Sequence, residues 1–269
     1  MLKDITFGQY FESNSVIHRL DPRVKLLLLI ASIVFIFVCS NIFSLTVLAV
    51  FTVMLIFLSK IPFKMYLKNL KAILPIIIFT AVLNLFYSDG SKALLSFWKL
   101  SVTEGGVYRS VFMTARIVLL ILISSSLTYT TTPNDLTDAI ERLLSPLKLI
   151  GLQNGVHVIA LMMTIALRFI PTLVEETEKI MNAQKARGAD LENGSIMTRI
   201  KALIPIIIPL LISSVRRAYE LAEAMECRCY NGGKGRKRLR KMTLKLSDGA
   251  ACLICCVFFG SVIVVNILL

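Results

Sequence analysis

Residues 24–39 read "VKLLLLIASIVFIFVC" and are nearly all leucine, isoleucine, valine and phenylalanine. Further apolar stretches follow at 42–58, 72–87, 110–129 and 249–269. Each is near the roughly 20 residues that a helix needs to cross the hydrocarbon core of a bilayer, with the first three at the short end. The sequence therefore predicts five membrane-spanning helices.

The composition agrees with a membrane protein. The chain has 269 residues, of which 56% are hydrophobic, a mean hydropathy of +0.74 and a formal net charge of +13. Soluble domains rarely combine this length with so much apolar sequence. The basic run "GRKRLRK" at 235–241 is typical of a segment that contacts anionic lipid beside a span. We expect the lipid bilayer as a partner and no nucleic acid.

The distribution of lysine and arginine predicts the orientation. The arm before residue 24 and the connection at 59–71 are basic, whereas the connections at 40–41 and 88–106 are uncharged or balanced. Because basic loops stay on the cytoplasmic side, we expect a cytoplasmic N-terminus and an external C-terminus. Residues 133–248, with 18 of the 30 Lys and Arg, would then form a cytoplasmic region between four spans in 1–132 and a last span in 249–269.

This cytoplasmic region contains a repeat. One segment runs from about 156 to 188 and the other from about 196 to 230, and each begins apolar and ends charged. The apolar halves, at about 13 to 15 residues, are too short to cross a membrane. Helical spacing continues through the charged halves, so each segment predicts one long helix. Pro205 and Pro209 predict a bend in the second helix.

The ends of the two segments match most closely. "AQKARGA" (183–189) aligns with "AMECRCY" (224–230), which places the two arginines 41 positions apart. A single cation in a last helical turn is explained by the helix dipole, worth about 0.3–1 kcal/mol. A duplicated one favours two equivalent contacts with a dimer or a pair of homologous subunits. The candidate docking residues are Ala186, Arg187, Gly188, Cys227, Arg228 and Cys229.

The residues of an enzyme are not found in the sequence. It has no Walker A motif, no H-E-x-x-H and no Ser/His/Asp set, so we expect no catalytic, cofactor-binding or metal-ligating residue. Cys227 and Cys229 lie in the predicted cytoplasmic region, where stable disulfides are rare, and are interpreted as small residues beside Arg228. A stand-alone secondary transporter, the alternative class, would place its repeats in the membrane, whereas this repeat is mostly outside it.

Three stretches carry a family resemblance: "HRLDPRVK" (18–25), "ALRFIPTLVEETEKIMNAQKARG" (166–188) and "AMECRCY" with the basic exit that follows it. Over essentially the whole chain, the sequence resembles the transmembrane T component of energy-coupling factor (ECF) transporters, the EcfT or CbiQ-like family. The resemblance implies an all-α membrane protein with about five transmembrane helices and two long crossed coupling helices. It also implies a non-catalytic scaffold of an ABC-type importer in a prokaryotic plasma membrane.

The resemblance further implies the partners. Two ABC-type ATPases, either an EcfA and EcfA′-like pair or a homodimer, would each receive one x-Arg-x motif, here 186–188 and 227–229. A membrane S component would bind the substrate, a vitamin, with a dedicated cobalt or nickel importer as the alternative. Because Cys229 lacks the freedom of glycine at positive φ, we expect the second helix to end later than the first, near 231–233.

Overall fold

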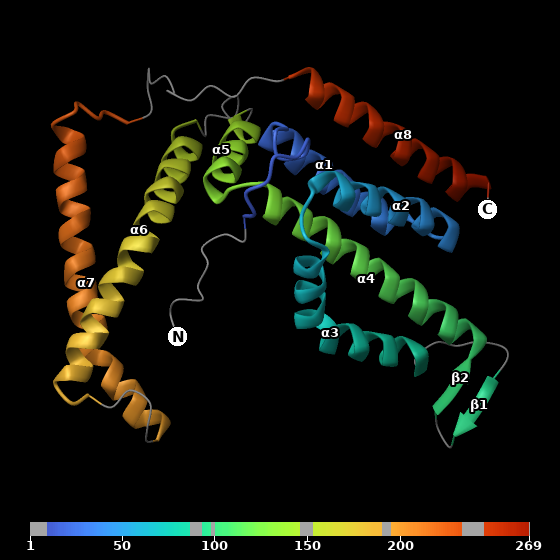
Figure 1. The fold of residues 1–269 in the computed structure, drawn as a ribbon, viewed down its shortest axis with the longest axis horizontal. Coiled ribbons are helices and arrows are strands. Elements are labelled where there is room, and N and C mark those ends of the chain that lie inside the picture. Colours follow the sequence, from blue (N-terminus) through green and yellow to red (C-terminus); the bar gives the residue numbers. More distant parts are fainter. Residues whose placement is uncertain are drawn as a thin grey trace. The chain divides into compact units, whose positions relative to one another are not determined.

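A computed structural model describes residues 10–86, 93–97, 100–145, 153–189, 195–232 and 245–268. Along these residues the elements are α1 (Pro22–Val38), α2 (Ile42–Ser59), α3 (Phe63–Phe86), β1 (Ala93–Phe97), β2 (Leu100–Thr103), α4 (Glu104–Thr130), α5 (Pro133–Leu143), α6 (Gln153–Ala186), α7 (Ile196–Glu226) and α8 (Leu246–Leu268) (Figure 1). The expected helical membrane architecture is confirmed. The short antiparallel hairpin of β1 and β2 is an addition that the sequence analysis did not anticipate.

Among the described residues, five helices are long and apolar enough to cross a membrane: α2, α3, α4, α6 from Gly155 onward, and α8. The total agrees with the prediction, but one member differs. α1 covers the first predicted span with only 17 residues, about 25 Å of helix against a core of about 30 Å. α6 joins the set because it continues through Pro171 as one helix of 34 residues, so its apolar half is longer than we expected.

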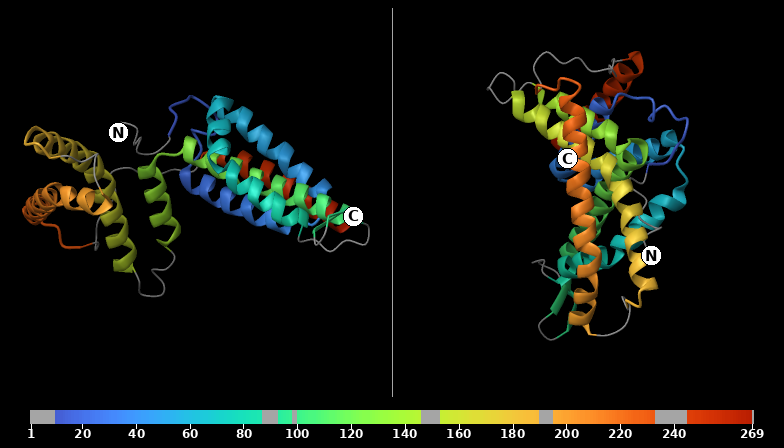
Figure 2. Two further views of the ribbon diagram at one scale, coloured as in Figure 1. Left: turned by 90° about the horizontal axis from the view of Figure 1, so that it is seen from below. Right: turned by 90° about the vertical axis from the view of Figure 1, so that its left-hand side faces the viewer.

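The chain divides into two compact units, one of residues 8–139 with 241–269 and the other of residues 140–240. In the first unit, α4 and α8 each pack against both α1 and α2 (Figure 2). Aromatic rings fill the middle of this bundle, where Phe35 stacks on Phe259 at 4.3 Å and Phe51 lies 5.1 Å from Phe258. Such offset contacts add to the burial of apolar area, so these rings join α8 to α1 and α2.

Helix α3 packs along α4 and is bent. Pro75 lies inside α3, and Figure 1 shows the helix axis changing direction along its length, because proline removes a backbone donor and crowds the preceding turn. Polar side chains join the two helices: Asn69 donates to Ser125 Oγ at 2.6 Å and Ser110 to the Ala81 carbonyl at 2.9 Å. A Cβ at Gly106 would lie 2.7 Å from the Leu85 carbonyl oxygen, so this close approach requires glycine.

Buried charges join the start of α1 to the end of α4. Lys25 is 7% exposed, and its ammonium donates to the carbonyls of Thr130 at 2.9 Å and His18 at 3.3 Å. His18 lies in the turn before α1, contacts Ser15 Oγ through Nδ1 at 2.6 Å, and has its pKa lowered by burial. A buried cation is stable only with such partners.

A buried carboxylate connects the start of α1 to the start of α8. Asp248 is 2% exposed and accepts hydrogen bonds from the backbone N–H groups of Asp21 at 2.9 Å and Lys245 at 2.7 Å. Asp21 in turn caps α1, because its side chain accepts from the Arg23 N–H at 3.0 Å. The unpaired donors at the starts of two helices are thus satisfied by two carboxylates.

Arg116 plays a similar role at the opposite end of α1. It lies within a predicted span, where a cation requires a partner. Its guanidinium donates to the Cys39 carbonyl at 2.6 Å and lies 4.7 Å from the centre of the Phe112 ring. The arginine therefore satisfies a free carbonyl at the end of a helix and gains a cation–π contact.

Replacing Lys25 with methionine tests the buried cation. Lys25→Met keeps an apolar stem but leaves the Thr130 and His18 carbonyls without their donor, so we expect unfolding to become easier by about 1.5–3 kcal/mol. Unfolding in detergent micelles, followed by circular dichroism, measures the difference. Lys64→Met, at an exposed position at the start of α3, is the control, and equal stability of the two variants would contradict the role of Lys25.

Candidate functional site

Helices α6 and α7 cross within the second unit (Figures 1 and 2). At the crossing, Arg217 on α7 pairs with Glu176 on α6 at 2.6 Å. On one side of this pair, Gln184 Nε2 donates to the Pro205 carbonyl at 3.4 Å. α7 stays continuous through Pro205 and Pro209. Its axis nevertheless changes direction along its first part in Figure 1, in line with the predicted bend.

The crossing follows the sequence repeat. Glu176 and Arg217 are 41 positions apart, the same offset as Arg187 and Arg228. In an antiparallel crossing of two copies, a contact between equivalent residues is the arrangement that a two-fold axis produces. The ion pair therefore marks a local pseudo-two-fold axis, and each arginine lies 11 residues beyond it, about 16 Å along its own helix.

The first arginine stands at a well-formed helix end. Gly188 has a φ of +85°, and its N–H donates to the Lys185 carbonyl at 3.0 Å. The Ala189 N–H reaches back to the Gln184 carbonyl at 3.0 Å. This pair of bonds is the Schellman motif, in which a left-handed residue closes the helix. Arg187 is the last residue before that left-handed position.

The second helix ends in the same way, and our expectation of a later end was wrong. Cys229 takes the left-handed conformation with a φ of +55°, and its N–H donates to the Glu226 carbonyl at 2.8 Å. The Tyr230 N–H donates to the Met225 carbonyl at 3.0 Å. Each bond is the 41-residue counterpart of one at the first end. Two backbone hydrogen bonds thus hold a cysteine where glycine is usual.

Both motifs are open to a partner. In the part of the chain that the structure describes, no hydrogen bond or ion pair involves the side chain of Arg187 or Arg228. Cys227 and Cys229 carry free thiols. The six candidate residues are all exposed: Ala186, Arg187, Gly188, Cys227, Arg228 and Cys229. The structure thus presents two exposed guanidinium groups on matching backbones.

The apolar halves of α6 and α7 are also exposed. Ile159 and Met162 on α6 are 57% and 62% exposed, and α7 continues this surface over several turns. Large exposed apolar surfaces mark sites that contact lipid or another protein. The most exposed apolar side chains of α7 before Arg217 are Met197, Ile207, Ile208, Leu211 and Ile212.

Sequence reasoning missed the Glu176–Arg217 pair. The alignment of the two repeats could have predicted it, because it places opposite charges at equivalent positions. The basic run at 235–241, which we assigned to lipid contact, lies outside the described residues.

The comparisons with known proteins agree with this geometry. Residues 13–239 match the CbiQ family model, described as a cobalt transport protein. A Clostridium kluyveri protein named energy-coupling factor transporter transmembrane protein EcfT is 50% identical over 94% of this chain and 93% of its own length. The chain belongs to the EcfT family. EcfT proteins of Ruminiclostridium cellulolyticum and Bacillus subtilis are 47% and 43% identical, over 99% and 90% of this chain and 98% and 91% of their own lengths.

Membership in the EcfT family confirms the resemblance inferred from the arm at 18–25 and the two arginine-bearing ends. The chain is accordingly a transmembrane component of an ECF transporter. Its five candidate spans are consistent with a place in the membrane.

Exchanging the residues at the left-handed positions tests the two helix ends. Cys229→Gly removes the steric penalty of a side chain at positive φ, and we expect the end of α7 to gain about 1 kcal/mol. Gly188→Ala should weaken the end of α6 by a similar amount. A Cβ there meets no atom within 4 Å, so the cost comes only from holding alanine at a positive φ. Amide hydrogen exchange at Tyr230 and Ala189 reads out the two effects. Unchanged exchange in both variants would contradict the assigned conformations.

Reversing charges tests the crossing. Glu176→Arg sets two cations against each other, so we expect the distance between spin labels at Asn182→Cys and Glu223→Cys, with the native cysteines replaced, to lengthen and broaden. Combining Glu176→Arg with Arg217→Glu should restore the original distribution. Glu175→Arg, at the exposed neighbouring position, should leave it unchanged. A double variant that resembles the single one would show that the pair does not set the crossing.

Proposed function

We propose that the chain couples ATP hydrolysis by partner subunits to substrate uptake in an ECF-type importer. The observation that carries this proposal is the duplicated helix end: two exposed arginines on identical backbone motifs, disposed about one crossing. A scaffold that touches two similar ATPases requires such a pair of equivalent contacts.

Each arginine would dock on one ATPase. A guanidinium presents donors in a fixed fork that suits carboxylates and carbonyls in a groove. The flanking residues, Ala186 and Gly188 on α6 and Cys227 and Cys229 on α7, are small, so the arginine can enter a narrow socket. Directly after each arginine, the residue with positive φ turns the chain away from the helix axis. The following chain therefore does not block access to the end of the helix.

The exposed apolar halves of α6 and α7 would bind the S component. These surfaces lie on the same two helices as the arginines, on the far side of the crossing from them. A displacement of the arginine-bearing ends would thus reach the apolar halves through two continuous helices. This arrangement supports coupling by motion of the helices rather than by any chemistry of the chain itself.

The transported substrate is proposed to be a vitamin, because the arm at 18–25 and the exit after 224–230 resemble the vitamin-type T components. The family model's description as a cobalt transport protein supports the alternative of a dedicated cobalt or nickel importer. Mass spectrometry of the S component that co-purifies from native membranes distinguishes the two. The basic arm and connection favour a cytoplasmic N-terminus and an external C-terminus.

Removing both arginines tests the docking. Since truncating one partner of a buried charged contact costs about 2–5 kcal/mol, we expect Arg187→Ala with Arg228→Ala to abolish uptake and to weaken ATPase association at least tenfold. Co-purification of the ATPases and uptake in proteoliposomes measure the two effects.

Two further variants sharpen this test. Lys179→Ala removes an exposed cation two turns before Arg187 on the same helix and should leave assembly intact. Arg187→Lys with Arg228→Lys keeps the charge but loses the fork, so it should assemble less well than the wild type. Normal assembly and uptake in the double alanine variant would exclude docking through these residues.

A further inference from the structure

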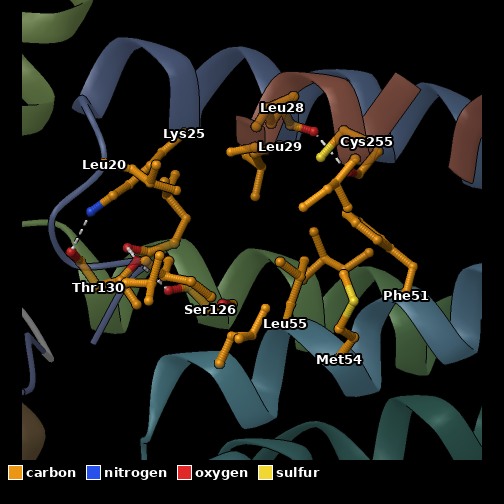
Figure 3. Close-up of a pocket in the computed structure, with 18 of the residues that line it drawn as sticks. Leu20, Lys25, Leu28, Leu29, Phe51, Met54, Leu55, Ser126, Thr130 and Cys255 are labelled. Carbon is orange, nitrogen blue, oxygen red and sulfur yellow. Dashed lines mark hydrogen bonds between the residues drawn. The ribbon is translucent and has the colours of Figure 1, made fainter. Parts of the chain in front are cut away.

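The four-helix bundle of the first unit contains a cavity of about 280 Å³. All four helices α1, α2, α4 and α8 line it, together with the arm before α1 (Figure 3). The aromatic contacts around Phe51 close one end, and Lys25 with Thr130 closes the other. About 10 Å of α1 lie between Lys25 and Ser32, both of which line the cavity.

The cavity is lined mainly by apolar side chains. Three of its polar lining groups donate to backbone carbonyls: Lys25 to Thr130 at 2.9 Å, Ser32 to Leu28 at 2.7 Å and Thr130 to Ser126 at 2.8 Å. Figure 3 shows the Lys25 nitrogen directed toward Thr130. Apolar cavities of about 150 Å³ stay dry and take up apolar molecules, and this one is larger.

The cavity is open to its surroundings. Val16, Leu58 and Ile254 line it and are 61%, 42% and 44% exposed. They come from the arm, the end of α2 and α8. Because α2 and α8 are candidate spans, the opening faces the region where acyl chains are the abundant apolar molecules.

Exposed cations lie close in sequence to residues that line the cavity. Arg19, Lys60 and Lys245 are exposed, and each lies within two positions of a residue that lines the cavity, Leu20, Leu58 and Ser247 respectively. The nearby carboxylates of Asp21 and Asp248 are buried and accept backbone hydrogen bonds. The rim is thus basic, and a basic rim favours an anionic headgroup.

We propose that this cavity binds an anionic phospholipid, with one acyl chain between α1, α2, α4 and α8 and the headgroup at the basic rim. The length of the cavity, about 10 Å along α1, fits within the roughly 15 Å that one leaflet of the hydrocarbon core provides. The cavity and the ATPase-docking residues are separate sites, because none of the six docking residues lines the cavity.

Photo-crosslinking of the full chain in proteoliposomes tests the site. Phosphatidylglycerol with a diazirine in the middle of one acyl chain should label peptides that contain residues 54–58 and 250–255. Ala251→Leu fills the cavity from α8, and we expect it to lower this labelling at least fivefold. Leu253→Phe adds volume on the same helix at a position that is 66% exposed and should leave the labelling unchanged.

A second filling variant guards against misfolding. Ser32→Leu occupies the cavity from α1, and only monodisperse protein from size-exclusion chromatography enters the liposomes. Loss of labelling in both filling variants supports the site, whereas undiminished labelling in a folded filling variant overturns it. The same probe on phosphatidylcholine should label several-fold less. Equal labelling by the two lipids overturns the assignment of an anionic headgroup.

Discussion

The contact between Glu176 and Arg217 determines where α6 and α7 cross, and the positions of both arginine-bearing ends follow from it. A partly exposed ion pair contributes little to stability, but this one joins equivalent residues of the two copies of the repeat. Both helices continue without a break on either side of it. The spacing of Arg187 and Arg228 is therefore a property of one crossing and of two equal lengths of helix.

The membrane unit depends on a different constraint, the need to satisfy every polar group inside the protein. Lys25, Asp248 and Arg116 are charged residues in or beside apolar helices, and each binds backbone groups at the end of a helix. Lipid offers no partner to those groups. The charges accordingly act as joints between α1, α4 and α8, while the aromatic rings between them supply the packing.

Much of this arrangement could be predicted from the sequence, because it rests on hydrophobic length and on an internal alignment. The spans at 42–58, 72–87, 110–129 and 249–269 and the two long helices were found in this way. The length of the apolar half of α6 was underestimated, because α6 from Gly155 onward is apolar enough to count as a candidate span. The end of α7 was predicted too late because a cysteine disfavours a positive φ. Two backbone hydrogen bonds outweigh that preference at Cys229. The partners of Arg116 and Lys25 come from distant segments, which local patterns do not bring together.

The positive φ of Cys229 makes the two helix ends unequal in stability. Their backbones have the same conformation, but Cys229 is held against its conformational preference and Gly188 is not. Even with two identical binding sites on the partners, the end of α7 would therefore unwind more easily than the end of α6. The two arginine-bearing ends would then dissociate from their partners in a fixed order, although their backbones are equivalent.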